Sequence, residues 1–303
     1  MLAFLPAPIL GMIVGLLIVI AITLSAVLIL LASPLKLLAK FWPASAAFTR
    51  AVMSGIQENW TSMNAQIFKL LPPIHWDVRG NVQPRRDSWY FVIANHQTWV
   101  DILASFHVLN RRVPPLKYFL KQELFYVPVI GLAVHALDYP FMKRYTREFM
   151  VKHPHLRGKD LETTRKACEK YQHYPVSVLN FLEGTRRTAE KHKQTQSPYR
   201  HLLKPKSAGA SFVLSALGQR MDCLLDLTIA YPQGTPSVWD LRCGRVRHIV
   251  IDMSTRPIPA EFCVGQYEND PVFRDNFQLW IGSIWEEKDN KLEQILNPSS
   301  KHS

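Results

Sequence analysis

The stretch Phe91-Val92-Ile93-Ala94-Asn95-His96-Gln97-Thr98-Trp99-Val100-Asp101 decides how the rest of this sequence is interpreted. Its first half belongs to an apolar run, rich in aromatic and β-branched residues, that predicts a buried strand. The run ends at the polar triplet Asn95-His96-Gln97, and Asp101 follows at the start of a helix-like apolar pattern. A strand that ends in polar groups and leads into a helix is a usual place for the chemistry of an α/β protein.

His96 and Asp101 are residue types that suit general base catalysis. A histidine can accept a proton at neutral pH, and a nearby carboxylate can fix its tautomer and stabilise the imidazolium. The same two residues occur close together by chance in many chains, where they form an ordinary structural pair. The pair alone therefore does not identify an active site.

A second stretch, Val178-Leu179-Asn180-Phe181-Leu182-Glu183-Gly184-Thr185-Arg186-Arg187, has the same order of features. It is an apolar, strand-like run that ends in polar residues, and these suit an anion. Arginine offers a planar fork for a phosphate, Thr185 a hydroxyl, and Gly184 lets the backbone approach closely. A base at one strand end and a phosphate clamp at another indicate transfer onto a phosphate-bearing alcohol.

Together, Asn95-His96-x-x-x-x-Asp101 and Phe181-Leu182-Glu183-Gly184-Thr185-Arg186 resemble the motifs of the glycerolipid acyltransferases, the PlsC-like lysophosphatidic acid acyltransferase group. The resemblance extends over about Trp76 to Ile258. The segment Lys121-Gln122-Glu123-Leu124-Phe125 and the pattern Pro128-x-x-Gly131 between the motifs are similar to a longer subgroup of that family.

The resemblance implies an activity and roles for individual residues. His96 would be the general base and Asp101 its partner, and the acceptor phosphate would be held by Glu183, Gly184, Thr185 and Arg186. The acyl donor would be acyl-CoA or acyl-carrier protein, and neither a cofactor nor a metal is implied. Lysophosphatidic acid is the first choice of acceptor, and other lysophospholipid headgroups stay open.

Arg144 is a further candidate for the acceptor phosphate. The family carries a Gly-x-x-Phe-x-x-Arg element here, and Phe141 and Arg144 match it. Asp138 stands where the family has glycine, so only the arginine is carried over.

The composition restricts the other classes of function. The chain has 303 residues, a formal net charge of +12 and a pI near 9.6, so an anionic partner is expected. The four cysteines lie far apart, which disfavours a disulfide framework or structural zinc and fits a reducing compartment.

Two other classes of function compete with the acyltransferase. A metal-dependent hydrolase would need more ligands than His96 and Asp101, and the further candidates His107 and His135 do not have the sequence spacing of metal ligands. A membrane-anchored protein that binds RNA or another polyanion is the main rival, although no nucleic-acid motif is present.

The first residues predict a membrane anchor. Residues 1–35 contain no charged side chain, and the apolar run from Ile9 to Ala32 is long enough for one helical crossing. Lys36, Lys40 and Arg50 follow the run, so the positive-inside rule places the rest of the protein on the cytoplasmic side of the inner membrane.

The remainder divides into three parts. Residues 36–72 predict an amphipathic interfacial helical segment that ends at Pro72-Pro73, and the same apolar face could equally cover the core of the domain. Residues 73–296 predict one α/β acyltransferase domain with a central mixed sheet flanked by helices, closed by an amphipathic helix from Pro271 to Leu296. Residues 297–303 predict a disordered tail. The apolar segment from Leu124 to Ala136 is too short, and too interrupted by Pro128 and Gly131, to be a second membrane span.

Overall fold

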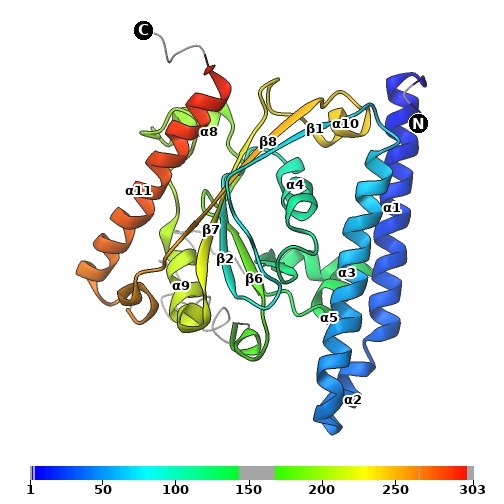
Figure 1. The fold of residues 1–303 in the computed structure, drawn as a ribbon, viewed down its shortest axis with the longest axis horizontal. Helices are drawn as coiled ribbons and strands as arrows, with labels where there is room; N and C mark the ends of the chain where they lie inside the picture. The colour runs from blue at the N-terminus through cyan, green and yellow to red at the C-terminus, as the bar shows by residue number, and fades with distance from the viewer. Residues whose placement is uncertain (1, 3, 143–167, 266, 299–303) are drawn as a thin grey trace.

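A six-stranded mixed sheet forms the centre of the computed structural model, which describes every residue except 1, 3, 143–167, 266 and 299–303 (Figure 1). The strand order is β1-β8-β7-β2-β6-β3. All neighbouring pairs are parallel except β7 and β8, which are antiparallel. The strands are β1 (His75–Arg79), β2 (Tyr90–Ala94), β3 (Leu116–Tyr118), β6 (Ser177–Phe181), β7 (Cys223–Ala230) and β8 (His248–Arg256). The predicted α/β class with a mixed sheet is confirmed.

Helices cover both faces of the sheet, which explains why β2 is apolar at every position. Tyr90, Val92 and Ala94 belong to the core on the side of α4 (Val100–Leu109) and the N-terminal helices. Phe91 and Ile93 belong to the core on the opposite side. That side is covered by α9 (Ser207–Leu217) and α11 (Pro271–Leu296), as Figure 1 shows.

Two long helices precede the sheet and lie side by side (Figure 1). They are α1 (Ala7–Ala32) and α3 (Ala46–Phe68), joined through α2 (Leu35–Phe41) and η1 (Pro43–Ser45). The predicted amphipathic segment 36–72 is therefore two helices, because Pro43 interrupts the first and begins a separate turn. Among the described residues, one helical stretch, Ala7–Phe41, is long and apolar enough to cross a membrane.

One face of α1 packs on the folded domain and the other is exposed. Leu10, Val14 and Ile29 are buried in the core that includes β2. Leu16 is 61% exposed on the other face of the helix. Both ends are held in place, because the Leu2 amide donates to the Leu70 carbonyl just after α3 at 3.0 Å, and Lys36, just beyond α1, forms an ion pair with Asp138 of the α/β domain.

The apolar segment 124–136 forms short elements rather than a span. It contains most of η2 (Gln122–Tyr126) and all of α5 (Ile130–Ala136), separated by Val129 with a φ of +65°. A Cβ on Gly131 would lie 2.0 Å from the Phe125 carbonyl oxygen, so glycine is required for this close packing. Beside it, β4 (Leu120–Lys121) pairs with β5 (Phe141–Met142).

The last helix, α11, begins at Pro271 as predicted, and the Asp270 side chain caps it by accepting from the Phe273 amide at 3.0 Å. Its apolar stripe, including Phe277 and Trp285, is buried against the sheet. The remaining short elements are η4 (Lys170–His173), α8 (Ala189–Gln194), η5 (Gly218–Arg220), α10 (Val238–Arg242) and η6 (Ala260–Cys263).

Candidate active site

The two predicted motifs meet because β2 and β6 are adjacent parallel strands. Their last residues, Ala94 and Phe181, are partners in register. His96 and Glu183 each follow two residues later, so the two turns lie side by side at one edge of the sheet. The His96 amide donates to Glu183 Oε1 at 2.8 Å, and the Arg187 amide donates to the His96 carbonyl at 2.8 Å.

His96 has the geometry of a general base. Its Nδ1 lies 2.8 Å from Oδ2 of Asp101. Because an ionised carboxylate can only accept, Nδ1 carries the proton and the lone pair of Nε2 is left for a substrate. The imidazole stacks on the Phe181 ring with centroids 4.2 Å apart, which further restricts its rotation. The side chain is 13% exposed, so the imidazole is shielded but accessible.

Asp101 is buried and held by four hydrogen bonds. Besides His96, Oδ2 accepts from the amides of Gln97 at 2.5 Å and Thr98 at 2.8 Å. The other oxygen, Oδ1, accepts from the Tyr231 hydroxyl at 2.6 Å. Asp101 also lies in the first turn of α4, where the helix dipole favours a negative charge. These contacts fix the carboxylate that orients the imidazole.

Tyr231 is a residue that sequence reasoning did not assign to the site. It follows β7 directly and precedes Pro232, and a tyrosine at the end of an apolar strand reads as a core residue. The one feature of the sequence that marks this position is Pro232, which ends the strand directly after Tyr231.

The turn after β2 is also fixed to β7. Asn95 Nδ2 donates to the Ile229 carbonyl and the Ile229 amide donates to Asn95 Oδ1, both at 2.8 Å. Gln97 Nε2 donates to the same carbonyl at 3.0 Å. Three neighbouring strands, β6, β2 and β7, therefore hold the histidine turn.

Glu183 lies beneath this turn and is 1% exposed. While Oε1 accepts from His96, Oε2 accepts from the Leu203 amide at 3.0 Å. Burial raises the pKa of Glu183 to about 7, although both amides act in the opposite direction. Both carboxylate oxygens accept from backbone amides, so Glu183 joins the histidine turn to the segment at Leu203.

Gly184, Thr185 and Arg186 form the accessible part of the second motif. Gly184 has a φ of +65°, the left-handed region that favours glycine. Lys206 Nζ lies 3.5 Å from the place of a Gly184 Cβ, and Lys191 Nζ donates to Thr185 Oγ1 at 2.6 Å.

The guanidinium of Arg186 is exposed, with its carbon 5.1 Å from the centre of the Trp99 ring. This arginine therefore links residues 184–186 to the start of α4, close to the histidine turn. Together with Lys191 and Lys206, three cations surround one short loop. Arg144, the other predicted phosphate ligand, lies outside the described residues.

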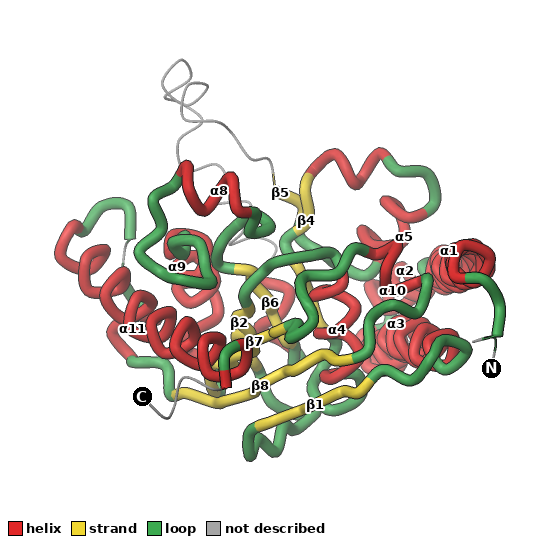
Figure 2. The backbone as a smooth tube through the Cα atoms, turned by 90° about the horizontal axis from the view of Figure 1, so that it is seen from above, coloured by secondary structure: helices red, strands yellow, loops and turns green. Residues whose placement is uncertain are grey.

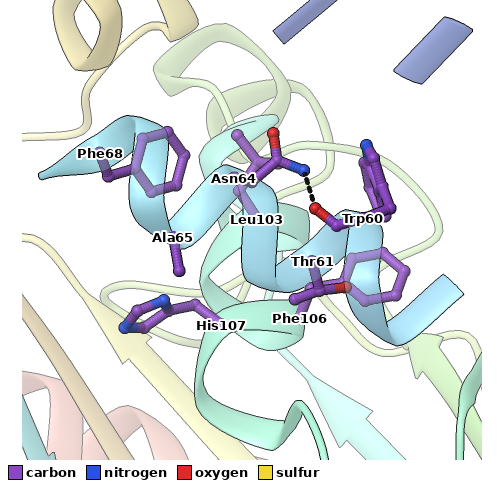
Figure 3. A pocket seen from close by; sticks show the side chains of 8 residues that line it. All are labelled: Trp60, Thr61, Asn64, Ala65, Phe68, Leu103, Phe106 and His107. Atoms are coloured by element: carbon purple, nitrogen blue, oxygen red, sulfur yellow. Dashed lines mark hydrogen bonds between the residues drawn. The ribbon is translucent and has the colours of Figure 1, made fainter. Parts of the chain in front are cut away.

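A small cavity lies between α3 and α4 rather than at His96 (Figure 3). Its volume is about 10 Å³, which is room for a single water. The cavity is lined by Trp60, Thr61, Asn64, Ala65, Phe68, Leu103, Phe106 and His107.

The two other histidines weighed as metal ligands lie in different surroundings from His96. His107, in the last turn of α4, stacks on Trp76 at 4.0 Å, and burial lowers its pKa. His135 lies in α5 against the Phe125 ring, with centroids 5.6 Å apart.

Comparisons with known proteins agree with this geometry. The family model described as Acyltransferase matches residues 75–229, just over half of the chain. The chain is 26% identical to lysocardiolipin acyltransferase 1 of Gallus gallus over 224 residues, which cover 67% of this chain and 53% of that protein. It is 25% identical to 1-acyl-sn-glycerol-3-phosphate acyltransferase gamma of Homo sapiens over 219 residues, which cover 68% and 53%.

The chain thus spans about half the length of these curated relatives. The crystal structure of the 1-acyl-sn-glycerophosphate acyltransferase PlsC of Thermotoga maritima aligns with a TM-score of 0.57 at 15% identity, over 94% of this chain and 95% of that one. That likeness concerns the fold, while the family match contains both motifs of the site described above. The chain belongs to the acyltransferase family.

Proposed function

We propose that this protein is a membrane-bound glycerolipid acyltransferase that moves a fatty acyl group from acyl-CoA or acyl-carrier protein to the free hydroxyl of lysophosphatidic acid. The observation that carries the proposal is the His96–Asp101 pair beside the cationic loop at 184–186. A base and a phosphate site on adjacent strand ends match an acceptor that carries a hydroxyl and a phosphate.

In the proposed reaction, Nε2 of His96 takes the proton of the acceptor hydroxyl as its oxygen attacks the thioester carbonyl. The C–S bond then breaks, the thiolate leaves, and the imidazolium returns the proton to it. Asp101 orients the ring and offsets its positive charge during the transfer. The attacking oxygen belongs to the substrate, so the protein supplies no nucleophile of its own.

The charge around the loop supports a phosphate monoester as the acceptor group. A monoester carries close to two negative charges at neutral pH, whereas a phosphodiester carries one. Arg186, Lys191 and Lys206 together supply three positive charges at the loop. Lysophosphatidic acid has such a terminal monoester. A lysophospholipid with a larger headgroup, such as the lysocardiolipin named for one relative, is the alternative acceptor.

The exposed apolar face of α1 supports membrane attachment. Met12, Leu16 and Leu31 are each at least 60% exposed, which is costly in water and favourable in lipid. The basic residues after the helix favour a cytoplasmic location for the domain. The contacts at both ends of α1 favour a helix that lies against the domain with its outer face in lipid, and a single crossing is the alternative. A cysteine introduced at Phe4 or at Phe41, in a variant that lacks the four natural cysteines, can be labelled from each side of sealed vesicles. Labelling of both positions from the same side supports the helix that lies against the domain, and labelling from opposite sides supports the single crossing.

The proposed acceptor is tested with detergent-purified full-length protein, acyl-CoA or acyl-carrier protein, and a panel of lysophospholipids. The proposal predicts the highest kcat/KM with lysophosphatidic acid. A higher kcat/KM with lysocardiolipin would support the same reaction with lysocardiolipin as the acceptor. If no acceptor is acylated and the protein binds RNA in a salt-sensitive way, the acyltransferase proposal is contradicted and the polyanion-binding function is favoured.

A further inference from the structure

His75 and Asp77 of β1 and His248 of β8 form a compact group at the open edge of the sheet. His75 and His248 are direct partners in the parallel pair, and Asp77 is two residues further along the same face of β1. One potential ligand atom from each residue lies within 4.8 Å of the other two. Figure 2 shows β1 beyond β8, with no helix on its outer side in the described part of the chain.

The distance between two of these groups suits an ion between them. His248 Nε2 lies 3.8 Å from Asp77 Oδ2, which is too long for a hydrogen bond. That nitrogen is buried and has no hydrogen-bond partner among the described residues. Two ligands of one tetrahedral zinc ion, each about 2.0–2.2 Å from the metal, stand roughly 3.3–3.6 Å apart, so a shift of a few tenths of an ångström would bring these two atoms to that separation.

We propose that His75, Asp77 and His248 bind one divalent transition-metal ion, for which Zn²⁺ is the reference. Two imidazoles and one carboxylate suit Zn²⁺, Ni²⁺ or Cu²⁺ rather than Mg²⁺ or Ca²⁺, which prefer oxygen ligands. His75 is exposed and the other two residues are partly buried, so an ion from solvent can reach the group.

The ion would tie the edge strand β1 to β8. β1 is the first strand after α3, so it connects the N-terminal helices to the sheet. None of the three residues belongs to the His96 site, so this proposal stands independently of the proposed function.

Arg79 competes with the ion for Asp77. Its Nε and Nη2 both donate to Asp77 Oδ2, at 3.0 and 2.6 Å. The charge of the Asp77 carboxylate is therefore partly neutralised by Arg79. Replacing Arg79 with an uncharged residue is expected to tighten metal binding.

The test is a calorimetric titration of the full-length, detergent-purified protein with Zn²⁺ at pH 7.5. The proposal predicts one saturable site whose affinity falls at least about tenfold in His248→Gln and in His75→Ala. Arg79→Gln should bind more tightly than the natural protein. His173→Ala, which removes an exposed histidine of η4, should bind as the natural protein does.

Two controls separate metal ligation from other effects. Thermal unfolding without metal should be the same for His248→Gln and the natural protein, and visible absorption of bound Co²⁺ reports the coordination directly. Zn²⁺ affinity unchanged in both histidine variants, or no saturable binding at all, would overturn the proposal. Acyl transfer measured without added metal should be equal in all four variants, so failure here leaves the proposed function untouched.

Discussion

The Tyr231 hydroxyl donates to Oδ1 of Asp101 at 2.6 Å, on the oxygen opposite the one that bonds His96. Both carboxylate oxygens are therefore held, one by the histidine side and one by the end of β7. Because Tyr231 is itself buried, the carboxylate cannot turn away from the imidazole without leaving that hydroxyl unpaired.

Tyr231→Phe removes this hydrogen bond without changing the shape of the side chain. A hydrogen bond to a charged group contributes about 1.5–3 kcal/mol, so we expect kcat to fall roughly 10- to 100-fold with KM little changed. The carboxylate also becomes more basic and stabilises the imidazolium, so the acid limb of the pH–rate profile should move to higher pH. Tyr139→Phe, which breaks the bond of another buried tyrosine to the Leu116 carbonyl, should leave that limb in place. An unmoved limb in Tyr231→Phe would contradict this role.

Glu183 should make stability depend on pH. Its folded pKa of about 7 lies above the ordinary glutamate pKa of 4.5, so between these two pH values the folded protein holds a proton that the unfolded chain has lost. The protonated Glu183 contributes its full stabilisation of the folded state below about pH 4.5. This contribution is lost as pH rises through 7, so the free energy of unfolding decreases by about 3 kcal/mol. Unfolding free energies measured between pH 4.5 and 8 should show this slope in the natural protein and in Glu286→Gln, but not in Glu183→Gln.

Lys191 should affect acceptor binding rather than the chemical step. Lys191→Met removes the charge that contacts Thr185 Oγ1, so KM for lysophosphatidic acid should rise roughly fivefold to tenfold, most strongly at low salt, with kcat nearly constant. Lys193→Met on the same helix is the matched control, because that side chain is exposed. Equal KM values for the two variants would contradict the assignment of Lys191 to the phosphate site.

Lys288 and Asp226 form a buried ion pair between α11 and β7. Lys288 also donates to the Leu227 carbonyl at 2.7 Å, and both side chains are at most 1% exposed. Lys288→Met leaves the carboxylate buried, with Arg256 at 3.7 Å as its remaining cation among the described residues, and should cost about 3–5 kcal/mol of stability. The double variant Lys288→Met/Asp226→Leu should recover most of it in chemical unfolding experiments, whereas additive losses would argue against a coupled pair.

Local pattern was sufficient for the elements that carry the two motifs. The apolar runs of β2 and β6 end where the polar residues begin, and the spacing from His96 to Asp101 places the carboxylate in the first turn of α4. The helix from Pro271 to Leu296 was also readable, because an acidic cap, a proline and an apolar stripe mark it.

Contacts between distant parts of the chain could not be predicted. Tyr231 meets Asp101 because β7 lies beside β2, and Lys206 meets Gly184 through the loop that returns to β6. Neither contact has a signature within its own segment. The burial of Glu183 could not be predicted either, because a glutamate in a polar turn is usually exposed.

The most direct test of the account is acyl transfer from acyl-CoA to lysophosphatidic acid by the natural protein, His96→Ala and the control His173→Ala. Removal of the general base should lower kcat about 100- to 10,000-fold, with thermal unfolding unchanged and the control fully active. Transfer that persists in His96→Ala at the rate of the control would contradict the assignment of His96 as the base.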